Sequence, residues 1–136
     1  MAYWLFKTEP ETWSWDAQVK MGTEPWGGVR NHQANNNMKA MKKGELGFFY
    51  HSGGERQVVG IVAVAQEHHP DTTDGTGRFG RVAVKTVKPF PAPVTLAAIK
   101  ANPKLANMVL VKNSRLSVQP VSDAEWREVC RMGGVK

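Results

Sequence analysis

The stretch ELGFFYHSGGERQVVGIVAVAQ, residues 45–66, decides which class of fold the sequence encodes. Its two ends, Glu45 to His51 and Gln57 to Gln66, are rich in aromatic, β-branched and small apolar residues, as buried strands are. Between them lies Ser52-Gly53-Gly54, where glycine can supply the left-handed backbone of a turn. The stretch therefore predicts two strands joined by a short turn.

Further strands are expected on both sides of this pair. Arg78 to Val87 alternates apolar and polar residues, and Tyr3 to Thr8 is an aromatic-rich run stopped by Pro10. Closer to the C-terminus, we predict closing strands at Met108 to Val111 and Ser114 to Val118. So many short strands favour a small, partly open β-barrel over a doubly wound sheet.

Helices are predicted at the margins of the barrel. The clearest runs from Asn31 to Lys43, because Asn31 can cap its start and Gly44 can end it. A capping box at Ser122 to Glu125 opens a last helix that stops near Gly133. The fold class is therefore α+β. Two shorter helices are expected at Thr12 to Val19 and Thr95 to Ala101.

The composition is that of one folded domain over residues 1–136, with 41% hydrophobic and 22% charged residues. No apolar run is long enough to span a bilayer, so we expect no membrane partner. The first residues lack the layout of a signal peptide, and the single cysteine, Cys130, excludes an internal disulfide. We therefore expect a soluble, cytoplasmic protein, and we expect it to be a monomer.

The charge balance points toward a polyanionic partner. Eighteen Lys and Arg residues against twelve Asp and Glu give a net charge of +6, which attracts nucleic acid first. Most lysines are scattered, and the three that are grouped are Lys39, Lys42 and Lys43.

Two patterns suggest a cofactor or a metal, and neither has the required context. Gly75, Gly77 and Gly80 have GxGxxG spacing, but the next segment alternates like a strand, whereas a dinucleotide site needs a helix there. His68 and His69 are adjacent, and no third ligand follows at a recognisable spacing. We interpret these segments as a β-connection and a solvated loop, and we predict no metal and no cofactor.

The tryptophans divide into three groups. Trp4 and Trp126 are expected in the core, whereas Trp13 and Trp15 flank a short helix and fit either a core or a site. Trp26 stands in PWGGVRN, where the glycines leave room for something flat, so a core role and a stacking wall both remain open. The helix that follows has free N–H groups at its start, and these attract anions.

Four blocks of the chain together resemble the EVE domain family. They are WLFKTEP at Trp4–Pro10, WGGVRNHQANNNMKAMKKG at Trp26–Gly44, FFYHS at Phe48–Ser52 and MVLVKNSRLSVQPVSDAEW at Met108–Trp126. The resemblance implies a PUA-like fold, a small β-barrel flanked by helices, related to the YTH readers of methylated adenine in RNA. It also implies a non-catalytic module that binds a modified base in DNA or RNA.

The resemblance further implies where such a base binds. A flipped-out base has two faces for stacking and one edge for hydrogen bonding, so Trp26 is expected to cover a face and Asn31 and Thr8 to read the edge. Phe79 is included because relatives commonly carry Trp there. The full expected set of ligand-binding residues is Lys7, Thr8, Trp26, Val29, Arg30, Asn31, Tyr50, His51, Ser52, Phe79, Arg115 and Ser117.

Two other functions stay open at this point. One is a small hydrolase or nuclease acting on nucleic acid or nucleosides, with His51 as general base and Lys7 as its electrostatic partner. The other is a small-metabolite sensor that uses the same pocket. No nucleophile or carboxylate pair accompanies His51 in the sequence, which favours a reader with no catalytic residues. The reader hypothesis makes a geometric prediction, namely that Trp26, Asn31 and His51 converge on one concave site.

Overall fold

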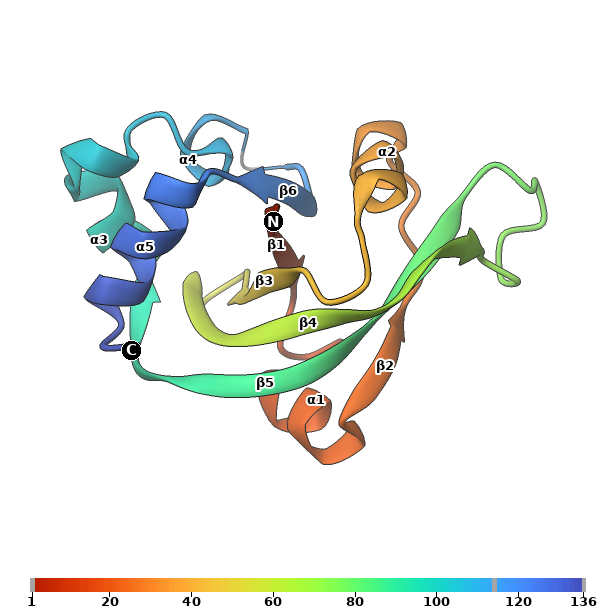
Figure 1. Ribbon diagram of the computed structural model, residues 1–136, viewed down its shortest axis with the longest axis horizontal. Helices are drawn as coiled ribbons and strands as arrows, with labels where there is room; N and C mark the ends of the chain where they lie inside the picture. Colours follow the sequence, from red (N-terminus) through yellow and green to blue (C-terminus); the bar gives the residue numbers. More distant parts are fainter. Residues whose placement is uncertain (1, 114, 136) are drawn as a thin grey trace.

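The computed structural model describes residues 2–113 and 115–135. Across these residues, six strands form one mixed sheet in the order β2-β5-β4-β3-β1-β6 (Figure 1). β1 pairs with β3 in parallel, and all other neighbouring strands are antiparallel. The strands are β1 (Tyr3–Thr8), β2 (Thr23–Trp26), β3 (Leu46–His51), β4 (Gln57–Pro70), β5 (Gly80–Thr95) and β6 (Val118–Val121).

The sheet is open, with β2 and β6 at its edges, and its long strands β4 and β5 curve together across the molecule (Figure 1). This arrangement confirms the predicted α+β class with a partly open barrel. Both edge strands contain a proline, Pro25 in β2 and Pro120 in β6. An edge strand tolerates proline because one side of its backbone needs no partner in the sheet.

The helices lie around the curved sheet. α3, α4 and α5 gather on one side of the molecule, while α1 and α2 lie apart from them (Figure 1). In the described part of the chain, no helix is long and apolar enough to cross a membrane. The helices are α1 (Trp15–Met21), α2 (His32–Ala40), α3 (Leu96–Ala101), α4 (Val109–Lys112) and α5 (Asp123–Met132), with a short 3₁₀ turn at Pro103–Leu105.

Both faces of the sheet are covered by apolar side chains. On β1, Trp4 and Phe6 belong to the core beside α1, α2 and β2, whereas Leu5 between them belongs to the core beside α3 and α5. Trp126 of α5 lies in the second core and stacks on Phe48 with a centroid distance of 4.0 Å. The expected core roles of Trp4 and Trp126 are therefore confirmed.

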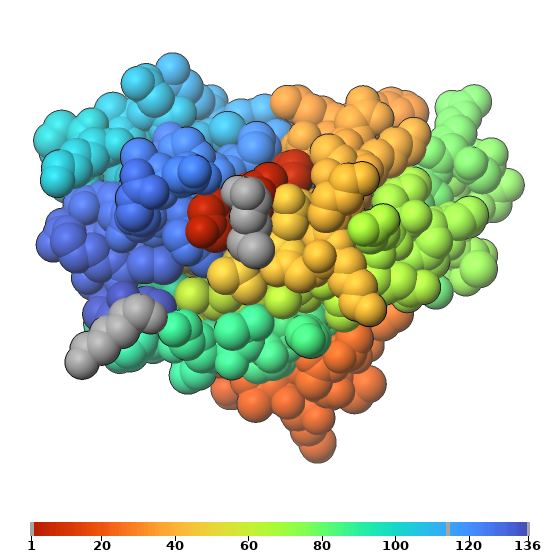
Figure 2. Space-filling view, viewed as in Figure 1, coloured from red at the N-terminus to blue at the C-terminus, as the bar shows by residue number. Residues whose placement is uncertain are grey.

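Figure 2 shows the start of β1 (red) at the surface between the C-terminal segment (blue) and the α2–β3 segment.

The predicted starts of α2 and α5 are confirmed. Asn31 caps α2 by accepting a 2.9 Å hydrogen bond from the N–H of Ala34, and Ser122 and Glu125 form the capping box of α5. α2 ends sooner than predicted, with Met41 as its C-cap, because Gly44 lies in the turn that leads into β3.

Several boundaries near the C-terminus and in the long hairpin differ from the prediction. Residues 109–112 form the helical turn α4 and not a strand, and the strand predicted at 114–118 lies at Val118–Val121. Residue 114 is outside the described residues. His68 and His69 belong to β4 and not to a loop, because β4 continues to Pro70. Gly75 and Gly77 of DGTGRFG lie in the connection between β4 and β5, as predicted, and Gly80 is the first residue of β5.

Candidate functional site

Trp26 lies at the end of β2, where its ring packs in the core and the residue borders a cavity. The side chain is 8% exposed, and its ring packs edge-to-face against Phe6 (5.3 Å) and Phe49 (5.7 Å). The remaining surface of the residue lines a cavity of about 410 Å³. Trp26 therefore belongs to the core and also borders the cavity, and its role as a stacking wall stays a prediction.

This cavity, which we call the tryptophan cavity, lies at the carboxyl end of β1 and against the loop after β2. Trp13 is its second tryptophan, and the indole N–H of Trp13 donates a 2.9 Å hydrogen bond to Oε1 of the buried Gln18. The tryptophan cavity is lined by Lys7, Thr8, Thr12, Trp13, Glu24, Pro25, Trp26, Gly27, Gly28, Val29, Arg30 and Ser117.

The structure separates the two tryptophans that the sequence left undecided. Trp15 is 8% exposed and packs edge-to-face on Phe49, and its ring lies so close to Gly60 that a Cβ there would approach it to 2.4 Å. Trp13 is only partly buried and lines the cavity. Ser14 caps α1 by accepting a hydrogen bond from the N–H of Ala17. This N-cap lies between Trp13, which lines the cavity, and Trp15, which packs in the core.

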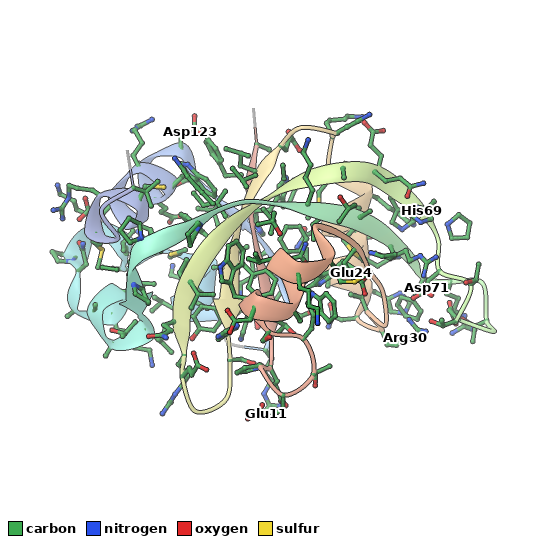
Figure 3. The ribbon with its side chains drawn as sticks, turned by 90° about the horizontal axis from the view of Figure 1, so that it is seen from below. Glu11, Glu24, Arg30, His69, Asp71 and Asp123 are labelled. Carbon is green, nitrogen blue, oxygen red and sulfur yellow. The ribbon has the colours of Figure 1, made fainter. Side chains whose placement is uncertain are left out.

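The loop Trp26-Gly27-Gly28 is held by a carboxylate from the β4–β5 connection. Oδ2 of Asp71 accepts hydrogen bonds from the N–H of Gly28 (3.0 Å) and from Nη1 of Arg30 (3.2 Å). Oδ1 of Asp71 accepts from the hydroxyl (2.6 Å) and the N–H of Thr73. Figure 3 shows Arg30 and Asp71 beside each other at one end of the molecule, far from Asp123 of α5.

Asp71 is fully buried and charged, which its hydrogen bonds explain. Its side chain has no exposed surface, and the Thr73 hydroxyl, together with the Gly28 N–H, holds the pKa of the carboxyl far below its ordinary value. Asp71 was not among the expected site residues, because its segment was predicted to be a solvated loop. A lone Asp 43 residues from its partner Gly28 gives no local signal.

Arg30 is positioned by the same network. Besides its ion pair with Asp71, its guanidinium group lies over the ring of Phe79 at 5.7 Å. The Arg30 side chain is 40% exposed and reaches the rim of the tryptophan cavity. Phe79 lines neither this cavity nor the second one described below, and its ring contacts His32 at 5.0 Å.

Both ring nitrogens of His51 form hydrogen bonds within the protein. Its Nε2 is 2.9 Å from the N–H of Trp15, and since a backbone N–H can only donate, Nε2 is the acceptor. The proton is therefore on Nδ1, which donates to Oε1 of Glu55 at 2.9 Å. This hydrogen bond from His51 lowers the pKa of Glu55.

The predicted convergence of Trp26, Asn31 and His51 is wrong. Asn31 and His51 line neither cavity. The Asn31 side chain caps α2, and the two ring nitrogens of His51 bond to the N–H of Trp15 and to the carboxylate of Glu55. Of the three, Trp26 alone lines the tryptophan cavity.

A second cavity, which we call the basic cavity, adjoins the first. It has a volume of about 550 Å³, and Lys7, Thr8 and Ser117 line both cavities. Tyr50, Ser52 and Arg115, which were predicted as site residues, line the basic cavity. Burial lowers the pKa of Lys7, whose Nζ lies over the Tyr50 ring at 5.8 Å. Nine of the twelve expected site residues thus line one or both of two adjacent cavities, whereas Asn31, His51 and Phe79 line neither.

The described residues offer no arrangement for a metal centre. Among residues 2–113 and 115–135, no group of three or more His, Cys, Asp or Glu side chains could hold a metal ion.

Comparison with known proteins adds independent findings. The family model of the EVE domain matches residues 2–132. Human thymocyte nuclear protein 1 is 31% identical over 92% of this chain and 71% of its own length. A crystal structure of an Agrobacterium tumefaciens protein has a TM-score of 0.97 at 53% identity, covering 99% of this chain and 94% of that chain. Human thymocyte nuclear protein 1 in complex with DNA containing 5-methylcytosine has a TM-score of 0.88 at 30% identity, covering 100% of this chain and 99% of that chain.

Proposed function

The chain belongs to the EVE domain family, and on this basis we propose that it is a non-catalytic module that binds nucleic acid and holds one modified base in the tryptophan cavity. The relative crystallised with DNA containing 5-methylcytosine makes that base, in DNA, the first ligand to test. RNA carrying a modified base is the alternative polymer.

The observation that carries this proposal is the lining of the tryptophan cavity. Its volume of about 410 Å³ is in the usual range for a small-molecule site. Trp13 and Trp26 provide flat aromatic surface, and stacking a base on an aromatic side chain contributes about 1–3 kcal/mol. The Thr8 and Ser117 hydroxyls provide polar atoms beside those rings.

The cations at the rim suit the backbone next to such a base. Lys7 and Arg30 line the same cavity as the two tryptophans, and phosphate contacts by Lys and Arg provide much of the affinity of nucleic-acid-binding proteins. Arg30 is fixed by Asp71, so it loses little freedom on binding.

The contacts of His51 argue against the hydrolase alternative. A general base needs a nitrogen within reach of the proton it removes, whereas both nitrogens of His51 bind the protein itself. His51 also lines neither cavity. A binding module needs no such group.

Fluorescence anisotropy with labelled single-stranded DNA tests the proposal. Three oligonucleotides are compared that differ only at the central position, which carries 5-methylcytosine, cytosine or an abasic site. We expect the order of affinity 5-methylcytosine, cytosine, abasic, with a preference for the methylated base of roughly fivefold to a hundredfold, because one methyl group provides only ~1–3 kcal/mol.

Equal affinity for the abasic and methylated oligonucleotides would contradict a base-holding cavity. The same three sequences in RNA test the polymer. Tighter binding of the RNA set would move the proposal from DNA to RNA.

A further inference from the structure

The basic cavity is lined by positively charged residues that lie far apart in the sequence. Four cationic side chains line it, Lys7, Arg56, Lys100 and Arg115, against one carboxylate, Glu9. They come from β1, the β3–β4 turn, α3 and the segment before β6, so only the fold brings them together.

The backbone at Arg56 supports a role for this cavity beyond packing. Among the described residues, Arg56 is the one non-glycine residue with a positive φ, +47°. An L-residue other than glycine, Asn or Asp rarely adopts this conformation, and such strain gathers at binding sites. The backbone carbonyl of Arg56 accepts a 2.8 Å hydrogen bond from the N–H of Leu96, which fixes the strained turn against the start of α3.

The two cavities share a wall, which indicates the part of a nucleotide that the basic cavity would bind. Lys7, Thr8 and Ser117 line both, and the backbone N–H of Lys7 donates a 2.8 Å hydrogen bond to the carbonyl of Ser117. A base in the tryptophan cavity would therefore have its sugar and phosphates next to the residues that border the basic cavity.

We infer that the basic cavity binds the phosphodiester next to the base held in the tryptophan cavity, so that the unit recognised is a nucleotide with its backbone and not a free base or nucleoside. This inference rests on the proposed function. It assigns affinity for the backbone to Arg56, Lys100 and Arg115, with Lys7 between the two cavities.

Isothermal titration calorimetry on the full chain tests the assignment. The ligands are a DNA trinucleotide with central 5-methylcytosine, the nucleoside 5-methyl-2′-deoxycytidine, and that nucleoside with a 5′- or a 3′-phosphate. The variants are Arg56→Gln, Lys100→Gln and Arg115→Gln, and the matched control is Arg127→Gln, which removes an exposed arginine of α5 that lines neither cavity.

We expect each variant in the basic cavity to weaken trinucleotide binding by roughly two- to fivefold at low salt and to leave nucleoside binding unchanged. Each should also reduce the slope of log affinity against log salt, by at most about 0.7, the value for one phosphate contact on a single strand. One of the two monophosphates should bind more tightly than the nucleoside, and the difference should fall in the Arg115→Gln variant. Arg127→Gln should match the wild type throughout.

The inference is overturned if the three variants bind the trinucleotide as the Arg127→Gln control does while the wild type still discriminates the methylated base. In that case the proposed function stands and the backbone lies elsewhere. If the wild type binds neither trinucleotide nor nucleoside, the proposed function itself fails, and the inference fails with it. Thermal unfolding midpoints of all variants ensure that losses of binding are not losses of folding.

Discussion

The carboxylate of Asp71 accepts a 3.0 Å hydrogen bond from the backbone N–H of Gly28, across 43 residues of sequence. Gly28 has a φ of +76°, which favours glycine, and a Cβ on its neighbour Gly27 would lie 3.3 Å from Oδ2 of Asp71. The glycine pair after Trp26 is thus explained by a sharp turn packed against a buried charge. The loop that borders the tryptophan cavity takes its shape from this contact.

Replacing Asp71 with Asn should weaken both folding and base binding. The amide places an N–H₂ donor where the carboxylate accepted from two sides, so one buried donor loses its partner at a cost of about 1–3 kcal/mol. Urea unfolding measures this loss. Asp74→Asn is the matched control for binding, because Asp74 accepts hydrogen bonds from Thr76 and Phe79 within its own loop. Equal binding by the two variants would contradict the role given to Asp71.

The same carboxylate makes a pH prediction. Because the folded-state pKa of Asp71 is depressed, its contribution to stability is fully present above the unfolded pKa, ~3.9, and is lost as the pH falls toward the folded value. Below about pH 4 the free energy of unfolding should therefore fall more steeply for the wild type than for Asp71→Asn. Parallel curves would show that Asp71 is not the group responsible.

Replacing Trp13 with Ala should mainly weaken binding, whereas replacing Trp15 with Ala should mainly reduce stability. Trp13→Ala should weaken oligonucleotide binding by roughly tenfold to a hundredfold, the value of one stacked base, with a smaller effect on stability. Trp15→Ala empties a core position against Gly60 and Phe49 and should cost about 3–5 kcal/mol in unfolding free energy. Unfolding and anisotropy measurements on both variants decide the assignment. Wild-type affinity in Trp13→Ala would remove this tryptophan from the site.

His51→Ala should destabilise the protein and reveal no catalytic function. The buried N–H of Trp15 loses its acceptor, which costs about 1–3 kcal/mol. Rigorously purified wild-type protein, with or without divalent metal, should not cleave single-stranded or duplex nucleic acid. Cleavage that is lost in His51→Ala, yet kept in an equally destabilised core variant such as Val62→Ala, would favour the hydrolase alternative.

Asn31 should matter for the helix and not for the choice of base. Asn31→Ala removes the N-cap of α2 and should cost about 1 kcal/mol, whereas Asn31→Ser keeps a capping oxygen and should restore most of that stability. Both variants should prefer the methylated oligonucleotide as the wild type does. Loss of that preference in the stable Asn31→Ser variant would indicate that Asn31 contacts the edge of the base after all.

The parts of the fold that the sequence predicted well are those with local signals. Asn31 and Ser122 indicate helix starts, because their side chains accept hydrogen bonds from N–H groups three residues further on. The valine-rich runs indicate β4 and β5. Residues 108–111 are as valine-rich as a strand, yet Met108 is the N-cap of the helix α4, which spans Val109–Lys112. The packing of Met108 and Leu110 in the second core overrides the strand preference of the valines.

The candidate site was harder to predict, since its decisive contacts join distant segments. Trp26 and Lys7 were among the expected site residues, and Trp13 was left open between the core and the site. Asp71 and Lys100 were not expected there, because each meets the site only through the fold. A motif also does not distinguish a side chain that faces a ligand from one that holds the scaffold. His51 lies within a motif block and still bonds only to the protein.

The most direct test of the account uses the side-chain N–H signals of the five tryptophans in a ¹⁵N-labelled sample. Titration with the 5-methylcytosine trinucleotide should shift the signals of Trp13 and Trp26, which line the cavity, and leave those of Trp4 and Trp126 in place. The abasic trinucleotide should shift neither cavity signal by a comparable amount. If the protein is saturated with the methylated ligand while the Trp13 and Trp26 signals stay unchanged, the base does not enter the tryptophan cavity and the central claim is wrong.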